Sequence, residues 1–202
     1  MLLSGRGSNL QAIVEARLPI DIVAVISNRP QASGLDYARA QGLTTLALDH
    51  AAHADRAAYD AQLAEAIERH QPDLVVLAGY MRVLSAAFVA RFEGHLLNIH
   101  PSLLPAFPGL KTHQRALDEG VKVHGCTVHF VTAQLDHGPI VVQAAVAVRA
   151  DDTAESLAAR VLVQEHRIYP QAIRWFAEGR LVNKCGHVNL KDDFTSQSVF
   201  PS

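Results

Sequence analysis

The sequence predicts an α/β protein with an open, mostly parallel, twisted sheet and helices on both faces. Four apolar runs, Ile22–Ile26, Thr45–Leu48, Leu74–Ala78 and Leu96–Ile99, are too short for helices and too uniformly apolar for strands with one face in water. Segments with helical spacing separate these runs. Strands and helices in alternation are typical of a parallel sheet that is covered on both faces.

Taken in order, the elements begin with a strand at Met1–Ser4, which is short for the centre of a sheet. A glycine turn then leads into a helix that begins near Ser8. The third helix has apolar residues at a spacing of four over Tyr59–Ile67, and Asp55 is the expected cap at its start.

The pattern changes after residue 100. A loop rich in Pro and Gly precedes a short helix near His113–Glu119, and two strand-like runs follow at Gly125–Thr132 and Ile140–Val148. Two consecutive strands predict an antiparallel C-terminal extension of the sheet. A helix at Ala154–Ala177 completes a single domain over residues 1–182, and the polar tail over residues 183–202 is expected to be loosely ordered.

Composition narrows the class of function. The chain has 202 residues and a formal net charge of −2, without the basic cluster that displaces counterions from nucleic acid. No apolar run reaches the roughly 18–20 residues that span a bilayer, and the first residues do not resemble a secretory signal. Cys126 and Cys185 match no metal-ligand spacing. We therefore expect a cytoplasmic protein that binds neither nucleic acid, membrane nor metal. We further expect small molecules as its partners, and a monomer or weak homodimer as its state.

Polar residues follow the predicted strands at the edge where open parallel sheets bind ligands. The segments are residues 4–9 (S-G-R-G-S-N), 27–29 (S-N-R), 78–82 (A-G-Y-M-R) and 98–102 (N-I-H-P-S). Because the carboxyl ends of parallel strands lie at one edge of a sheet, we expect these segments to converge there.

The first of these segments leads directly into a helix. A phosphate bound by the amides of Gly7, Ser8 and Asn9 is one interpretation, because a helix N-terminus presents unpaired N–H groups and the positive end of the helix dipole. The other is a plain glycine turn in which Ser8 or Asn9 caps the helix. The spacing matches neither the dinucleotide fingerprint nor the Walker loop.

Four further side chains are candidates for chemistry. Alternation along a strand puts Asn98 and His100 on the same side, where an amide and a protonated imidazole can receive negative charge on a carbonyl oxygen. Asp136 follows the first late strand, and a carboxylate beside an imidazole favours the charged form of the ring. Alternatively, His100 caps a turn and Asp136 only forms one. Glu165 lies on the apolar face of its helix and needs a partner, either a ligand group or a neighbouring Arg.

Longer motifs cover most of the chain. They are G-x-G-S-N-L-Q-A-I at 5–13, P-D-L-V-V-L-A-G-Y-M-R at 72–82, L-L-N-I-H-P-S-L-L-P-x-F-P-G-L at 96–110, H-F-V-T-x-x-L-D-x-G-P-I at 129–140 and Q-E-H-x-I-Y-P at 164–170. Over roughly residues 2–182 the sequence resembles the phosphoribosylglycinamide formyltransferases, folate-dependent enzymes of purine biosynthesis. The string N-I-H-P-S-L-L-P is shared by the wider superfamily, whereas G-S-N at 7–9 and P-G-L at 108–110 are typical of this branch.

The resemblance implies a Rossmann-like formyltransferase fold and a specific reaction. The co-substrate 10-formyltetrahydrofolate would donate its formyl group to the amine of 5'-phosphoribosylglycinamide, giving formylglycinamide ribonucleotide and tetrahydrofolate. By position, the resemblance implies that Asn98, His100 and Asp136 are catalytic. It also implies two binding sets, Gly7, Ser8, Asn9 and Glu165 for the substrate phosphate and ribose, and Arg56, Met81, Arg82, Val83, Leu84 and Asn98 for the folate.

Two alternatives stay open. A formyltetrahydrofolate hydrolase or a methionyl-tRNA formyltransferase uses the same donor, but the first carries an N-terminal regulatory domain and the second a C-terminal basic barrel, and we expect room for neither in 202 residues. A protein that only binds folate or nucleotide would leave the polar trio without a role.

Overall fold

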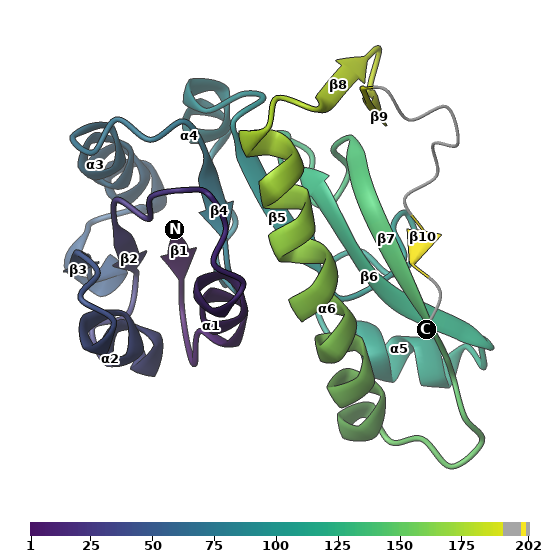
Figure 1. Ribbon diagram of the computed structural model, residues 1–202. Coiled ribbons are helices and arrows are strands. Elements are labelled where there is room, and N and C mark those ends of the chain that lie inside the picture. The colour runs from purple at the N-terminus through teal and green to yellow at the C-terminus, as the bar shows by residue number, and fades with distance from the viewer. Residues whose placement is uncertain (192–198, 201–202) are drawn as a thin grey trace. The chain divides into compact units, whose positions relative to one another are not determined.

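The computed structural model describes residues 1–191 and 199–200 of the chain (Figure 1). The chain divides into two compact units, Met1–Asn98 and Ile99–Ser202. Each unit has its own strands, helices and buried side chains, and each is described by itself. The expected single domain over residues 1–182 stays a prediction.

The first unit contains a parallel sheet with the strand order β3-β2-β1-β4-β5. Its strands are β1 (Leu2–Leu3), β2 (Val25–Ser27), β3 (Thr45–Ala47), β4 (Val75–Leu77) and β5 (Leu96–His100). β1 is central, because Leu2 is in register with both Ile26 of β2 and Leu77 of β4. The predicted α/β class with parallel strands is confirmed, including the short first strand.

β2 and β4 are shorter than the apolar runs that predicted them. The run Ile22–Ile26 becomes a strand only from Val25, and the run Leu74–Ala78 only over Val75–Leu77. The reason is the length of their common neighbour: β1 has two residues, so few ladder hydrogen bonds can form beside it. Residues of the runs outside the ladder, such as Ala24 and Ala78, are buried all the same.

The helices of the first unit are α1 (Ser8–Glu15), α2 (Ser33–Ala40), α3 (Arg56–Glu68) and α4 (Ala86–Arg91), with a short 3-10 helix η1 at His50–Ala52. α1 contacts α2 and α3 contacts α4, and Figure 1 shows the strands between the two pairs. One buried cluster joins Leu10 of α1 and Leu35 of α2 to Leu3 of β1. α3 begins as predicted, since the Asp55 carboxylate accepts a hydrogen bond from Ala58 N at 2.8 Å.

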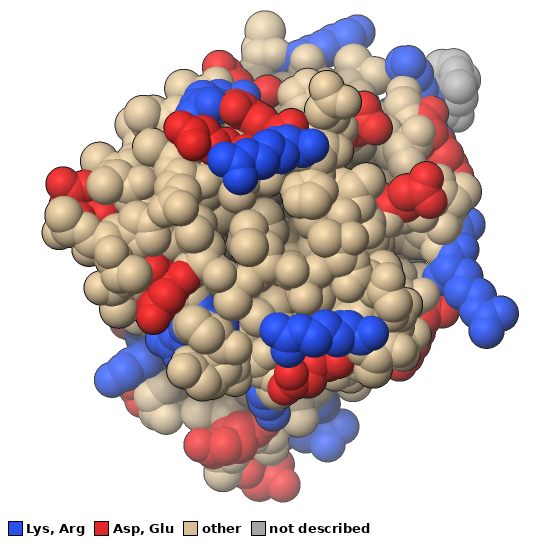
Figure 2. Space-filling view, turned by 90° about the vertical axis from the view of Figure 1, so that its left-hand side faces the viewer, with Lys and Arg blue, Asp and Glu red and all other residues tan. Residues whose placement is uncertain are grey.

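The surface of the first unit mixes charges of both signs. Figure 2 shows Lys and Arg next to Asp and Glu over this face, as expected from a net charge of −2. Arg39 pairs with Asp36 at 2.7 Å, and Arg91 pairs with Glu68 at 2.5 Å. Within residues 1–191 and 199–200, no helix has the length and hydropathy that crossing a membrane requires.

The second unit is built on an antiparallel pair, β6 (Val123–Phe130) and β7 (Ile140–Ala147). β10 (Val199–Phe200) runs parallel to β7. The helices are α5 (Thr112–Asp118) and α6 (Ala154–Ala177), and α6 packs along both strands and against α5 (Figure 1). The predicted antiparallel extension is confirmed, with element boundaries within two residues of those expected.

The C-terminal tail is more regular than its polar composition predicted. A hairpin of β8 (Leu181–Lys184) and β9 (His187–Leu190) begins inside the expected domain and continues into the segment expected to be loosely ordered. Gly186, with φ of 83°, and Cys185, with φ of 52°, form its tight turn. Residues 183–190 thus have regular secondary structure, and the expected loose order of residues 183–202 stays a prediction. Residues 192–198 and 201–202 lie outside the described residues.

α6 starts with a reciprocal cap. Ser156 N donates to Thr153 Oγ1 at 3.2 Å, and Thr153 N donates to Ser156 Oγ at 3.0 Å. This capping box satisfies two N–H groups that no helical carbonyl can reach. It fixes where a helix of 24 residues begins.

Thr153→Ala should lower the free energy of unfolding by about 1 kcal/mol, because the helix loses one side-chain acceptor. In a chain of this size the melting temperature should fall by roughly 2–4 °C. Urea unfolding of wild type, Thr153→Ala and Thr153→Ser would measure this, and the serine variant, which keeps the hydroxyl, should match wild type. An alanine variant with an unchanged midpoint would show that the cap contributes nothing.

Two histidines pair inside the second unit. His124 of β6 is 1% exposed, and its Nε2 lies 3.2 Å from Nδ1 of His113 in α5. Burial lowers the pKa of His124 from 6.5 to about 4, His113 and His100 add to the effect, and the Pro101 carbonyl opposes it. Burial also lowers the pKa of His113. Both rings are therefore neutral at neutral pH, and one donates its N–H to the other.

This pair should make the fold acid-sensitive. Above pH 6.5 His124 is neutral both folded and unfolded, but between pH 6.5 and 4 only the unfolded chain takes up the proton, so stability falls as the pH drops. Each pKa unit of difference corresponds to about 1.4 kcal/mol. The free energy of unfolding, measured at pH 7, 6 and 5, should fall less steeply in His124→Gln than in wild type. Parallel pH profiles for the two proteins would contradict this assignment.

Candidate active site

In the first unit, the turn after β1 leads into α1 through a left-handed glycine. Gly7 is the residue before the helix, with φ of 75° and ψ of 29°, and no side chain caps the helix. The interpretation in which Ser8 or Asn9 caps α1 is therefore wrong. The N–H groups in the first turn of a helix point away from its carbonyls, and this geometry at the start of α1 suits an anion.

Ser4 links three of the segments that follow strands. Its hydroxyl donates to Asn28 Oδ1 at 2.6 Å and accepts from Met81 N at 2.8 Å. The side chain is 3% exposed. The predicted convergence of residues 4–9, 27–29 and 78–82 is thus confirmed within this unit. The sequence analysis did not single out Ser4, although its place at the end of a strand and before a glycine was a usable signal.

The segment Met81–Leu84 presents apolar side chains to solvent. Met81 is 60% exposed and Val83 50% exposed. Arg82 lies over the Tyr59 ring, with 4.8 Å between its guanidinium carbon and the ring centroid. Leu84 is half-buried, and Arg56 is exposed at the first position of α3, three residues before Tyr59.

Asn98 and His100 lie on β5, two residues apart. Asn98 is half-buried and in register with Leu77 of β4. His100 is 6% exposed. The expectation that the two side chains act on the same atom stays a prediction.

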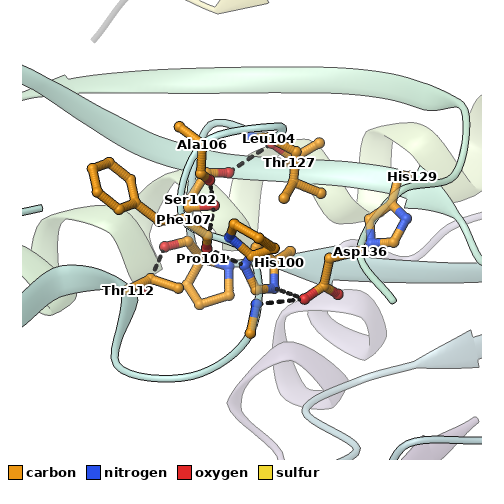
Figure 3. Close-up of polar contacts among 12 residues, drawn as sticks. His100, Pro101, Ser102, Leu104, Ala106, Phe107, Thr112, Thr127, His129 and Asp136 are labelled. Carbon is orange, nitrogen blue, oxygen red and sulfur yellow. Dashed lines mark hydrogen bonds and ion pairs between the residues drawn. The ribbon is translucent and has the colours of Figure 1, made fainter. Parts of the chain in front are cut away.

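In the second unit, His100 meets Asp136 as the sequence predicted (Figure 3). Nδ1 of His100 lies 3.5 Å from Oδ2 of Asp136, a distance of an ion pair, and both side chains are less than 10% exposed. Nε2 of His100 lies 3.0 Å from the carbonyl oxygen of Phe107. Both ring nitrogens of His100 therefore face oxygen acceptors.

Asp136 has a second donor. Gly109 N donates to the same Oδ2 at 2.8 Å. A buried carboxylate is stable only where donors or cations surround it, and the backbone N–H and the imidazole supply both. The interpretation of Asp136 as a mere turn former is therefore wrong, although its φ of 51° shows that it also shapes the turn.

Hydrogen bonds from side chains to the backbone hold the loop between His100 and α5 (Figure 3). The Thr127 hydroxyl donates to Ser102 O at 2.6 Å and accepts from Leu104 N at 3.0 Å. The Ser102 hydroxyl donates to Ala106 O at 2.6 Å, and the Thr112 hydroxyl donates to Pro101 O at 2.7 Å. These bonds fix the carbonyl of Phe107 and the N–H of Gly109 where His100 and Asp136 use them.

Backbone strain gathers around this pair. Among the described residues, six non-glycine residues have positive φ, and three of them are Phe107 (54°), Lys111 (56°) and Asp136 (51°). Such conformations cost about 1–3 kcal/mol each and cluster at functional sites. The loop over residues 107–111 and the turn at Asp136 therefore have a defined geometry that costs the fold some stability.

Two buried groups nearby complete the second unit's polar interior. His129 is 1% exposed, burial lowers its pKa, and its Nδ1 donates to Phe130 O at 2.9 Å. Figure 3 shows its ring beside Asp136, a neighbour that the sequence analysis missed. Glu165 of α6 is 8% exposed. The pKa of the Cys126 thiol in β6 is raised, mainly because the thiol is buried and also because of the negative charge of Glu165. Glu165 is thus an acidic group inside the unit, as its place on the apolar stripe predicted.

Neither unit shows a metal-binding arrangement in its described residues. No group of three or more His, Cys, Asp or Glu side chains in residues 1–191 and 199–200 is placed to hold a metal ion. The free cysteines are Cys126, which is buried, and Cys185, which is exposed.

The chain is similar to known proteins along nearly its whole length. A family model described as formyl transferase matches residues 1–173. The phosphoribosylglycinamide formyltransferase of Escherichia coli (strain K12) is 52% identical over 185 residues, which are 90% of this chain and 87% of that protein.

Solved structures agree with this similarity. The structure of glycinamide ribonucleotide transformylase 1 from Symbiobacterium toebii matches with a TM-score of 0.91 and 54% identity, over 95% of this chain and 92% of that one. The phosphoribosylglycinamide formyltransferase of Coxiella burnetii matches with a TM-score of 0.93 and 44% identity, over 99% and 97%. The predicted formyltransferase fold is confirmed, and the chain belongs to the phosphoribosylglycinamide formyltransferase family.

Proposed function

We propose that the protein transfers the formyl group of 10-formyltetrahydrofolate to the amine of 5'-phosphoribosylglycinamide, a step of de novo purine biosynthesis. The products are formylglycinamide ribonucleotide and tetrahydrofolate. Membership of the family supports the reaction, and the buried His100–Asp136 pair is the observation that carries the chemistry. An imidazolium held by a carboxylate suits a reaction in which negative charge develops on a carbonyl oxygen.

The proposed reaction is an acyl transfer through a tetrahedral intermediate. The substrate amine attacks the formyl carbon, a carbon–nitrogen bond forms, and the carbonyl electron pair moves to oxygen. Asn98 donates a neutral N–H to this oxyanion and His100 a charged one. Collapse of the intermediate breaks the bond to N10 of the folate, and the proton lost by the amine passes to N10, with Asp136 ordering a water that relays it.

The Phe107 carbonyl has a part in this scheme. It accepts the Nε2–H of His100 at 3.0 Å, so an oxyanion that uses this N–H must compete with it. The oxyanion is the stronger acceptor, because it carries a negative charge opposite the charged donor, whereas the Phe107 carbonyl is neutral. His100 can therefore exchange a backbone acceptor for the oxyanion without changing its protonation.

The remaining residues take binding roles in this proposal. The amides of Gly7, Ser8 and Asn9 bind the substrate phosphate, which suits the uncapped start of α1. Glu165 binds the ribose hydroxyls. The folate set keeps the members that the family resemblance implied, namely Arg56, Met81, Arg82, Val83, Leu84 and Asn98.

Local features support the folate assignment. Met81 and Val83 offer exposed apolar surface to a flat pterin ring, and the exposed charge of Arg56 suits the carboxylates of the glutamyl tail. No metal takes part in the proposed steps. Small-molecule partners, a monomeric or weakly dimeric state and a cytoplasmic location stay predictions of the sequence.

One experiment separates this reaction from its alternatives. Formyl transfer from 10-formyltetrahydrofolate would be assayed with glycinamide ribonucleotide, with water alone and with charged initiator tRNA as acceptors. We expect turnover with the ribonucleotide and only background with the other two. Hydrolysis without an acceptor, or transfer to the tRNA at a comparable rate, would favour the formyltetrahydrofolate hydrolase or the tRNA formyltransferase reaction instead.

His100→Ala and Asp136→Asn should each lower kcat by at least about 10²–10³. The first removes a donor to the oxyanion, and the second removes the carboxylate that holds this donor in its charged form. Steady-state kinetics would measure the loss, and circular dichroism with thermal melting would show that the fold persists. Asp21→Asn, at an exposed aspartate of the first unit, is the matched control and should keep wild-type kcat. Near-normal turnover in either site variant would refute the assigned roles.

A further inference from the structure

The first turn of α2 packs, backbone against backbone, on the turn that precedes α1. Gly34 N donates to the carbonyl oxygen of Gly5 at 3.0 Å. A Cβ atom on Gly34 would lie 2.9 Å from Leu3 Cδ2, 3.0 Å from Gly5 O and 3.1 Å from Gly7 Cα. Such distances are shorter than carbon atoms tolerate without displacement of a neighbour.

The contact is reciprocal. A Cβ atom on Gly7 would lie 2.9 Å from Gly34 Cα. Gly7 must in any case be glycine for its own backbone, since its φ is 75°. Gly34 is different, because it lies inside α2, where the helical backbone accepts any ordinary residue.

Helix propensity gives no reason for a glycine at position 34. Alanine there would suit the helical backbone at least as well, because glycine loses more conformational freedom on folding. The absent side chain therefore has its reason outside α2, in the turn over residues 5–7 that Gly34 touches. Gly34 is buried, and the three atoms nearest to an added Cβ belong to Leu3 and to this turn.

We propose that Gly34 is a positioning residue for phosphate binding. Because Gly34 has no side chain, the Gly5–Gly7 turn can pack directly against α2. This close packing sets the position of the turn, and with it the position of the first amides of α1 relative to a bound phosphate. This inference rests on the proposed function, in which those amides bind the substrate phosphate. It adds a residue from a distant segment that the phosphate does not touch.

The surroundings of Gly34 cannot absorb an added atom cheaply. Leu3 is fully buried and belongs to the cluster that contains Leu10 and Leu35. The other two neighbours are backbone atoms of the turn itself. A Cβ atom on Gly34 must therefore push the turn, by a few tenths of an ångström, away from α2.

Gly34→Ala should raise the KM for glycinamide ribonucleotide and the Kd for inorganic phosphate about tenfold, because small misplacements of binding groups cost large factors in affinity. The kcat at saturation should stay within about twofold of wild type, because His100 and Asp136 are untouched. Kinetics would give KM and kcat, and calorimetric titration with inorganic phosphate would give Kd. Ser33→Ala, at the exposed neighbouring position of α2, is the matched control and should keep wild-type values.

A second variant separates displacement of the turn from crowding of the core. Leu3→Val shortens the one side chain in contact with the added Cβ but leaves Gly5 O and Gly7 Cα in place. Gly34→Ala combined with Leu3→Val should therefore melt at a higher temperature than Gly34→Ala, yet bind phosphate as weakly. Leu3→Val alone should bind phosphate as wild type does. The double variant also serves the test if Gly34→Ala does not fold.

Two results would overturn the inference. The first is wild-type Kd for phosphate in a folded Gly34→Ala, and the second is recovery of that Kd in the double variant, which would make the effect one of core packing. Failure of the proposed function looks different, because the wild-type protein would then transfer no formyl group to the ribonucleotide in any of these experiments.

Discussion

The buried negative charge of Asp136 is the constraint on which the second unit depends. A carboxylate that is only 8% exposed would be strongly destabilising without compensation, and it receives compensation from two directions, the N–H of Gly109 and the ring of His100. The backbone donor requires a particular path for residues 107–111. The ring requires that β5 end at the right place. Both requirements concern the loop over residues 101–111, which explains why that loop has so many bonds to the rest of its unit.

Strain and its support lie in the same segment. Phe107 and Lys111 have left-handed backbone conformations, which residues other than glycine rarely adopt. Without support, the loop would relax to a less strained conformation. The hydroxyls of Ser102, Thr112 and Thr127 bind backbone groups of residues 101–106 and hold the path instead. Gln143 of β7 extends the support, since its amide donates to both Leu104 O and Thr127 Oγ1 at 2.9 Å. The site residues therefore depend on hydroxyl and amide side chains that do not themselves touch the pair.

The sequence predicted the elements well and the contacts unevenly. Apolar runs located β2, β3, β4 and β5, whereas β1 was inferred from the turn that follows it. The length of each ladder depends on the partner strand, which no single run reveals. The chemistry of His100 and Asp136 left their pairing as one of two interpretations, and the family resemblance favoured it. The hydrogen bond from Gly109 N to Asp136 was not predicted, because every residue except proline has a backbone N–H and the sequence does not show which of them lies near a carboxylate. The hairpin β8–β9 was missed because its strands are short and polar, so its signal lies mostly in the turn at Gly186.

Each unit has hydrogen-bond donors held in place by the fold, and these donors are suited to stabilise negative charge. In the first unit these are the amides of α1, set by Gly7 and linked through Ser4 to the segment at Met81. In the second they are the N–H of Gly109 and the ring of His100, set by the loop. Fixed donors stabilise a developing charge without reorganising, whereas water must first turn its dipoles. Strained residues at these sites cost free energy, and the contacts of the surrounding fold offset that cost.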